Sequence, residues 1–136
     1  MVARWPAKIP ADSTSDCTIS LSDLFATFAE LVDRELPPES AEDSTSILSV
    51  LLGEENRIAE RDSVFIMGNG KDSAIAVCSG QWKLIVRYGN EKERGHELYD
   101  LQADPGDQNN LSEEHPEIVK TMFAAYQTAD TNGRTR

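Results

Sequence analysis

The sequence predicts an α+β fold. In this fold a small antiparallel sheet of about four strands packs against a C-terminal helix, and an extended segment and two helices precede the sheet. Two observations predict it. Apolar residues recur at helical spacing near both ends of the chain, whereas between them apolar and polar residues alternate. The strand patterns also follow one another without a helix between them, which favours an antiparallel over a parallel sheet.

The N-terminal part is predicted to be an extended segment followed by a helix over 22–33. Two prolines exclude a regular helix from the segment 2–20. Ser20 or Ser22 is placed to cap the helix, because a serine oxygen can accept a bond from a free backbone N–H group. The apolar residues form one continuous stripe along this helix: Leu21, Leu24, Phe25, Phe28, Leu31 and Val32.

A second, short helix is predicted within "STSILSVLLGEE", residues 44–55. Ser44 or Thr45 is the expected cap. Gly53 is the expected stop, since glycine adopts the left-handed conformation that ends many helices. The residues expected to point inward are Ile47, Leu48, Leu51 and Leu52.

The hydrophobic period then changes to two, which is typical of strands. A tight turn at Ser79-Gly80 is predicted to join the second and third strands, and the charged run 89–95 is predicted to be a loop. Lys83 and Arg87 are an even number of residues apart, so they lie on the same face of the third strand, and this is expected to be the solvated face. The predicted strands are 63–67, 73–79, 81–88 and 98–101.

The last part of the chain is predicted to form a turn and a helix. Asp104 to Asp107 reads as a type II β-turn, in which Gly106 would take the positive φ, and the Asp104 carboxylate is expected to accept backbone N–H bonds. Pro116 fits the first position of a helix running to about residue 129. Its apolar face would consist of Ile118, Val119, Met122, Phe123 and Tyr126.

Composition and charge exclude several classes of partner. The 136 residues are enough for one domain with one core. A net charge of −11 argues against nucleic acid and against anionic membranes, both of which require a basic face. No apolar run approaches the roughly 18 residues of a membrane-spanning helix. We therefore expect no nucleic acid and no membrane among the partners.

Residues that could carry chemistry are few. Cys17 and Cys78 could pair or remain as free thiols. Cys17 has no histidine nearby in sequence, and Cys78 alternates with Val77 in a predicted strand, where core packing is expected. His96 and His115 lack partners at metal-ligand spacing, so no metal site is predicted. The run "GNGK" at 68–71 has neither the spacing nor the following helix of a phosphate-binding loop. Taken alone, these residues predict no catalytic centre.

The order of motifs resembles the C-terminal part of a formylglycine-dependent sulfatase of the alkaline-phosphatase-like superfamily. "RWPAKIP" at 4–10 resembles the family's Arg-Trp-Pro-Gly-Lys-Ile segment, with Ala7 in place of glycine. "ISLSDLFATFAEL" at 19–31 resembles its Ser-Leu-x-Asp-Leu-x-Pro-Thr-Leu helix. The later segments that match in the same order are "DSTSILSVLLGE" at 43–54, "SGQWKLI" at 79–85 and "ELYDLQADPGDQNNL" at 97–111.

The resemblance also implies what this stretch lacks. The family makes its formylglycine nucleophile from the cysteine of Cys-x-Pro-Ser-Arg. Residues 17–21 keep Cys17 and Ser20 but have Ile19 for proline and Leu21 for arginine, so Cys17 is not expected to be converted. The resemblance implies calcium and formylglycine for the parent protein, and it places their ligands upstream. The chain would then be a C-terminal fragment without an active site.

The resemblance further implies two parts and one partner. Residues 1–60 would pack on the N-terminal catalytic domain of the same chain, and 61–136 would form the C-terminal subdomain. The parent would hydrolyse a sulfate ester, and loops of the subdomain would border the substrate cleft. Asn69 and Lys71 are the candidate substrate-binding residues, with the polar loop 90–96 behind them. The alternatives are the C-terminal part of a phospho- or phosphonate hydrolase, and a stand-alone interaction module.

Overall fold

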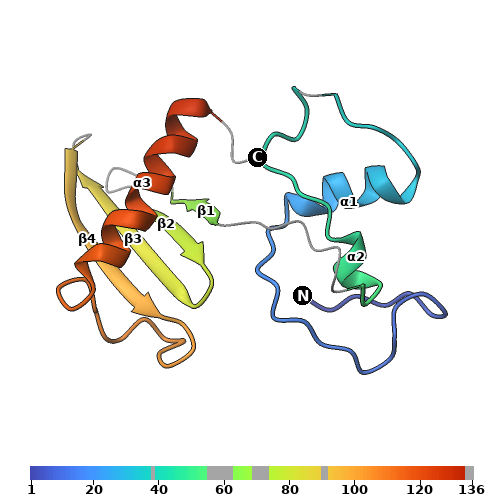
Figure 1. Cartoon of the computed structure of the whole chain (residues 1–136), viewed down its shortest axis with the longest axis horizontal. Coiled ribbons are helices and arrows are strands. Elements are labelled where there is room, and N and C mark those ends of the chain that lie inside the picture. The colour runs from blue at the N-terminus through green and yellow to red at the C-terminus, as the bar shows by residue number, and fades with distance from the viewer. Residues whose placement is uncertain (38, 55–62, 69–73, 90–91, 134–136) are drawn as a thin grey trace. The chain divides into compact units, whose positions relative to one another are not determined.

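The chain, described here by a computed structural model, divides near residue 61 into two compact units (Figure 1). The structure describes residues 1–37, 39–54, 63–68, 74–89 and 92–133. The element order is two helices, four strands and a third helix, so the predicted α+β fold is confirmed. No helix among the described residues is long and apolar enough to cross a membrane.

The first unit contains α1 (Asp23–Leu31) and α2 (Leu48–Leu51). Before α1 the chain forms turns and irregular structure, as the prolines predict. Ser22 is the N-cap of α1, but its side chain makes no capping bond. The helix instead buries Asp23, Ala26 and Thr27 on its inner face.

The second helix is shorter than predicted, and its cap is different. Ile47, not Ser44 or Thr45, is the N-cap, and it makes no side-chain capping bond. The Ser44 hydroxyl is unavailable because it accepts a bond from the Ala26 N–H and donates one to the Ser22 carbonyl. Gly53 follows the helix with φ 76°, which confirms it as the stop.

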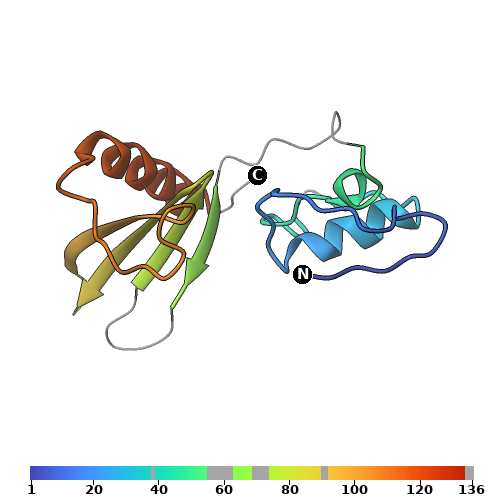
Figure 2. The same cartoon turned by 90° about the horizontal axis from the view of Figure 1, so that it is seen from below.

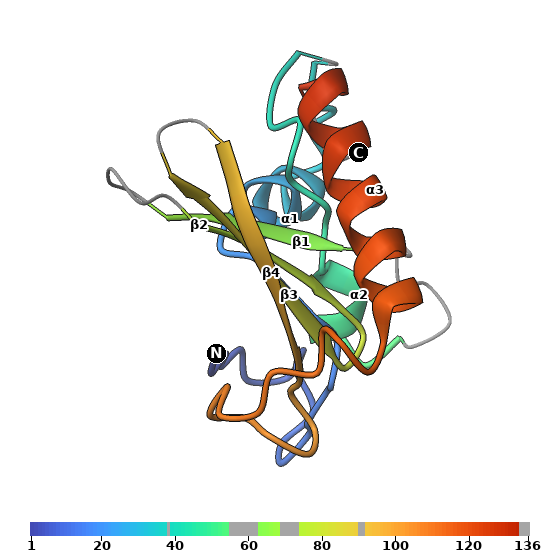
Figure 3. The same ribbon diagram turned by 90° about the vertical axis from the view of Figure 1, so that its left-hand side faces the viewer.

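The second unit is built on one antiparallel sheet with strand order β1-β2-β3-β4. Its hairpins place neighbouring strands side by side, and the predicted tight turn is confirmed, with Gly80 at φ 54° (Figure 3). In the register, Val77 faces Leu84, which in turn faces Leu98. The strands are β1 (Val64–Met67), β2 (Ala74–Ser79), β3 (Trp82–Gly89) and β4 (Lys92–Asp100).

The core of this unit lies between the sheet and α3 (Pro116–Asn132), which runs along one face of the sheet (Figure 2). Pro116 occupies the first turn, as predicted, and Gly133 ends the helix at φ 66°. The predicted apolar face of α3 is confirmed, because all five of its residues belong to or pack against the core cluster. The buried members of that cluster are Ile75, Val77, Leu84, Val86, Leu98 and Met122.

Two local predictions are wrong. The segment 89–95 is not wholly a loop, because β4 already begins at Lys92. An edge strand tolerates charged side chains, so its charges do not prevent pairing. The turn at 104–107 is closed by a bond from the Asp107 N–H to the Asp104 carbonyl (3.3 Å), but it is not type II. Asp107 (φ 52°), rather than Gly106, has the positive φ.

Candidate functional site

The residues predicted to contact a substrate are Asn69 and Lys71. Asn69 and Lys71 lie outside the described residues. Of the predicted loop behind them, Asn90 and Glu91 also lie outside, and the rest of the run to His96 is strand β4. The charges of this run therefore belong to a paired strand rather than to a free loop.

The first unit buries a charged group, the carboxylate of Asp23, which is 1% exposed. One oxygen accepts a bond from the Ser20 N–H (2.6 Å), and the other accepts a bond from the Thr45 N–H (3.0 Å). The two donors lie on either side of α1 in the sequence. Asp23 thus ties the start of the helix to the segment that leads into α2.

Two buried hydroxyl groups, those of Thr27 and Ser44, strengthen the same connection. Thr27 donates to the Asp23 carbonyl (2.6 Å) and accepts from the Ile47 N–H (3.0 Å). Ser44 bonds to α1 in the same way, through Ser22 and Ala26. Each of these bonds satisfies a backbone or side-chain group, so this network is a structural connection and not a set of free catalytic groups.

The opposite face of α1 is apolar and exposed. The exposed fractions are 80% for Leu21, 58% for Phe25, 58% for Phe28 and 63% for Val32. Trp5 in the preceding segment is 39% exposed. The helix therefore buries polar residues and exposes large apolar ones, which is the reverse of an ordinary surface helix. We call Leu21, Phe25, Phe28, Leu31 and Val32 the α1 stripe.

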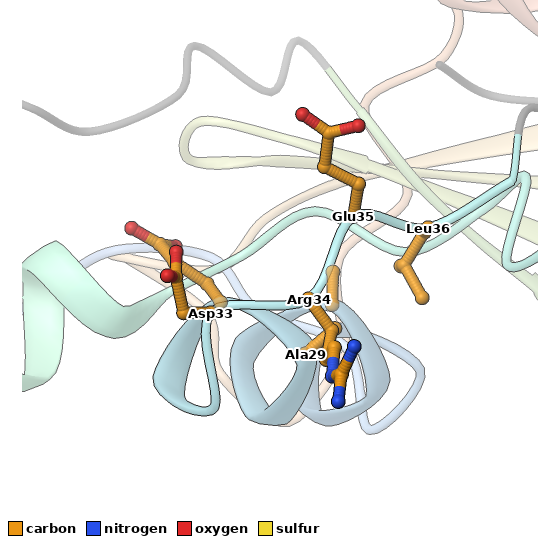
Figure 4. Close-up of a pocket in the computed structure, with 7 residues that line it drawn as sticks. Ala29, Asp33, Arg34, Glu35 and Leu36 are labelled. Atoms are coloured by element: carbon orange, nitrogen blue, oxygen red, sulfur yellow. The ribbon is translucent and has the colours of Figure 1, made fainter.

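A hollow of about 460 Å³ lies beside the C-terminal end of α1 and the segment that follows (Figure 4). Its charged residues include Asp33, Arg34 and Glu35, and the figure shows that their side chains point in different directions. Groups that do not converge cannot hold a reacting atom between them. The charged side chains around this hollow are therefore not arranged as a catalytic centre.

In the second unit, the sheet face opposite α3 carries an ion pair with good geometry. The Arg87 guanidinium donates to both oxygens of Glu97 (2.6 and 3.0 Å), and the Tyr99 hydroxyl donates to the same carboxylate (3.1 Å). The hydrogen bonds from Arg87 lower the pKa of Glu97, and those to Glu97 raise the pKa of Arg87. Burial and the bond to Glu97 raise the pKa of Tyr99. All three groups are thereby held in their ordinary charge states at neutral pH.

Cys78 lies on the same face, opposite Lys83 in the register. Lys83 forms an ion pair with Asp107 from the loop after β4. Burial raises the pKa of Cys78, the nearby Lys83 lowers it, and Asp107 raises it; the net shift is upward. A thiol with a raised pKa is a poor nucleophile, so Cys78 is a packing residue here.

The described residues do not fit the groups that a sulfatase active site needs. Both cysteines are free, and the Cys17 thiol donates to the carbonyl of its neighbour Thr18 (3.8 Å). The sequence around Cys17 departs from the formylglycine motif at Ile19 and Leu21. Within the described parts of the chain, no group of three His, Cys, Asp or Glu side chains could hold a metal ion.

A comparison of the sequence with known protein families identifies the family of this chain. A family described as "N-sulphoglucosamine sulphohydrolase, C-terminal" matches residues 1–130. The chain belongs to this family of sulfatase C-terminal regions. The resemblance drawn from the five motifs is thus confirmed, and the terms sulfatase, hydrolase and C-terminal domain apply to the family.

Individual relatives agree with the family. N-acetylgalactosamine-6-O-sulfatase of Bacteroides thetaiotaomicron is 32% identical over 141 residues, which cover 96% of this chain and 27% of the relative. A solved structure from work on the metabolism of multiple glycosaminoglycans by the same organism superposes with a TM-score of 0.62 at 31% identity. That match covers 80% of this chain and 24% of the other.

A more distant solved structure shares the fold. It is a complex with its substrate D-glucosamine-2-N,6-O-disulfate, and it superposes with a TM-score of 0.64 at 22% identity, over 79% of this chain and 23% of the other. This sulfatase C-terminal region therefore spans about a quarter of the length of the relatives it matches. The family typically uses formylglycine and calcium in the catalytic domain.

Proposed function

We propose that this chain is the C-terminal fragment of an enzyme that hydrolyses sulfate esters of sugars, and that it supplies structural support and cleft loops but no catalytic centre. The family match over residues 1–130 carries the proposal. The sugar class is supported by the names of the relatives, since one acts on N-acetylgalactosamine 6-O-sulfate and another on ulvan. The catalytic domain of the same protein is the proposed partner.

The α1 stripe supports the structural role. Because its large apolar side chains are exposed while polar ones are buried beneath, the stripe is arranged to be covered by another apolar surface. We propose that residues 1–60 pack on the catalytic domain through this stripe. Residues 61–136 then form the subdomain that brings Asn69 and Lys71 to the substrate, with Lys71 attracting an anionic group and Asn69 binding a hydroxyl.

Sulfate release from N-acetylgalactosamine 6-sulfate tests the proposal. The protein extended by the catalytic domain is expected to release sulfate, whereas the 136-residue chain alone is expected to release none, because its described residues supply no nucleophile and no metal cluster. In the extended protein, Lys71→Ala is expected to raise KM more than it lowers kcat, since the contact would be equal in ground and transition states.

Controls make each part of this test decisive. Turnover by the chain alone that survives repurification and Cys17→Ala would contradict the absence of a catalytic centre. An extended protein that releases phosphate from a phosphate ester but no sulfate would establish the phosphohydrolase alternative. Unchanged kinetics in Lys71→Ala, compared with Lys120→Ala on the exposed side of α3, would remove Lys71 from the substrate cleft.

A further inference from the structure

A second cavity, of about 280 Å³, opens in the second unit where the β2–β3 hairpin meets α3. Its volume is just below the range of about 300 to 1,000 Å³ found for ligand pockets, so it suits one small ring rather than a chain of rings. The residues that line it are Ser79, Trp82, Glu117, Ile118, Thr121 and Met122.

The fold brings these residues together for clear reasons. Ser79 and Trp82 are the pair that closes the hairpin, so their side chains lie next to each other on one face of the sheet. On α3, Glu117 and Thr121 are four residues apart and therefore lie on the same side of the helix. The cavity thus has an indole on the sheet side and a carboxylate and a hydroxyl on the helix side.

The indole of Trp82 is held in place before any ligand arrives. It is partly buried against the core of the unit. The imidazole of His115 contacts it with ring centroids 5.2 Å apart and a tilt of 57°. The His115 backbone is itself fixed, because its carbonyl accepts the first bonds of α3, from Ile118 N (3.1 Å) and Val119 N (3.2 Å). A preoriented ring binds a ligand at a lower entropic cost.

The polar groups have bonding capacity left for a ligand. The Thr121 hydroxyl donates to the Glu117 backbone carbonyl (2.9 Å), so its oxygen can still accept a bond. The Glu117 side chain is 70% exposed, and one of its oxygens lies 3.7 Å from His115 Nδ1. Apolar Ile118 and Met122 complete the lining. An aromatic surface beside acceptor groups matches a molecule with an apolar face and a rim of hydroxyls.

We propose that this cavity binds one neutral sugar ring. The C–H face of a sugar packs on the indole, and its hydroxyls donate to Glu117 and Thr121. A sulfated ring is disfavoured, because the carboxylate of Glu117 and a net charge of −11 repel a second anion. The choice of a sugar rests on the proposed function, whereas the shape and charge of the cavity do not.

Titration of the ¹⁵N-labelled 136-residue chain tests the proposal, with N-acetylgalactosamine and its 6-sulfate as probes. We expect shifts of the Trp82 indole N–H and of the backbone around residues 79–82 and 117–122. Binding is expected in the millimolar range, as for other small polar ligands that make few contacts, and the sulfated probe should bind more weakly. Trp5→Phe identifies the Trp82 indole signal, since these are the two tryptophans.

Matched variants locate the site. Glu117→Gln is expected to weaken binding about tenfold, because it removes hydrogen bonds to a charged acceptor. Thr121→Val should also weaken binding, whereas Thr128→Val should leave it unchanged. Thr128 makes the same type of helix bond as Thr121, to the Ala124 carbonyl (2.9 Å), but lies outside the cavity. Glu114→Gln is the corresponding control for Glu117.

Three results would overturn the proposal. These are no shift at the cavity at high probe concentration, equal affinity in Glu117→Gln, or tighter binding of the sulfated probe. The titration needs no turnover and no catalytic domain. A chain that fails to bind sugar would therefore contradict the sugar cavity but not the proposed sulfatase function. An extended protein without sulfatase activity would contradict the proposed function but not the cavity.

Discussion

Asp23 shows how much of a residue's role depends on distant sequence. The pattern of apolar residues predicts a helix around it, and an acidic residue in a first turn is ordinary there. The pattern does not predict that its carboxylate accepts the N–H of Thr45, from a segment more than twenty residues later. Almost every residue has a backbone N–H group, so the sequence does not indicate which one donates to Asp23, and only the structure shows this contact.

Asp23→Asn is expected to destabilise the chain by about 2 kcal/mol, as for loss of a buried hydrogen bond to a charged acceptor. An amide has one acceptor oxygen where the carboxylate uses two, so its NH₂ group would face either the Ser20 or the Thr45 N–H. Urea unfolding followed by circular dichroism measures the change. Asp33→Asn is the control, because Asp33 is exposed and asparagine tolerates its φ of 54°. Equal stability of both variants would show that the network contributes nothing.

At the scale of elements, the first three strands follow from the sequence, whereas the first half of the edge strand β4 does not. In β2 the large residues Ile75 and Val77 alternate with small ones, and in β3 Leu84 and Val86 recur at every second position, because one face of each strand is packed under α3. The first half of β4 carries charges at successive positions and has no apolar alternation. It is a strand because β3 offers it backbone partners, with one irregularity in register between Arg87 and Tyr88, and because Arg87 pairs with Glu97 across the strands.

Glu97→Gln is expected to weaken this edge in a pH-dependent way. The pKa of Glu97 is lowered in the folded chain by its bonds to Arg87, so its contribution is complete above its ordinary value of 4.5 and is lost as the pH falls through the lowered value. Because the Arg87 side chain is 54% exposed and water screens the pair, we expect a loss of only about 0.5 kcal/mol at pH 7. Unfolding measured at pH 7 and below pH 4 should show the variant and the native chain converging at acid pH, and Glu113→Gln should show no such convergence. A difference in the free energy of unfolding that grows at acid pH would contradict the stabilising role of the Arg87–Glu97 pair.

At the scale of the whole molecule, the sequence predicts the family better than it predicts the site. Five loose motifs in order indicate a sulfatase C-terminal region, because a shared order of segments is more specific than any one segment. Asn69 and Lys71 could be proposed only from that resemblance, and they lie outside the described residues. The α1 stripe is visible in the sequence as an apolar pattern. Only the structure shows that this stripe faces outward while Asp23 and Thr27 are buried.

The stripe makes the isolated chain prone to association. A contiguous exposed apolar surface binds hydrophobic dyes and other copies of itself, so we expect dye fluorescence and a concentration-dependent rise in mass by light scattering. Phe25→Ser with Phe28→Ser should reduce both effects at a cost of about 0.5 kcal/mol or less per site, because both side chains are 58% exposed. Met67→Ser is the control, since Met67 is 73% exposed but lies in β1 and not in the stripe.

In the protein extended by the catalytic domain, the same double variant should instead cost about 3 kcal/mol or more, because there each phenylalanine would be buried. A native chain that stays monomeric and binds no dye at high concentration would contradict the stripe as an interface, as would a double variant that is equally well tolerated in both proteins.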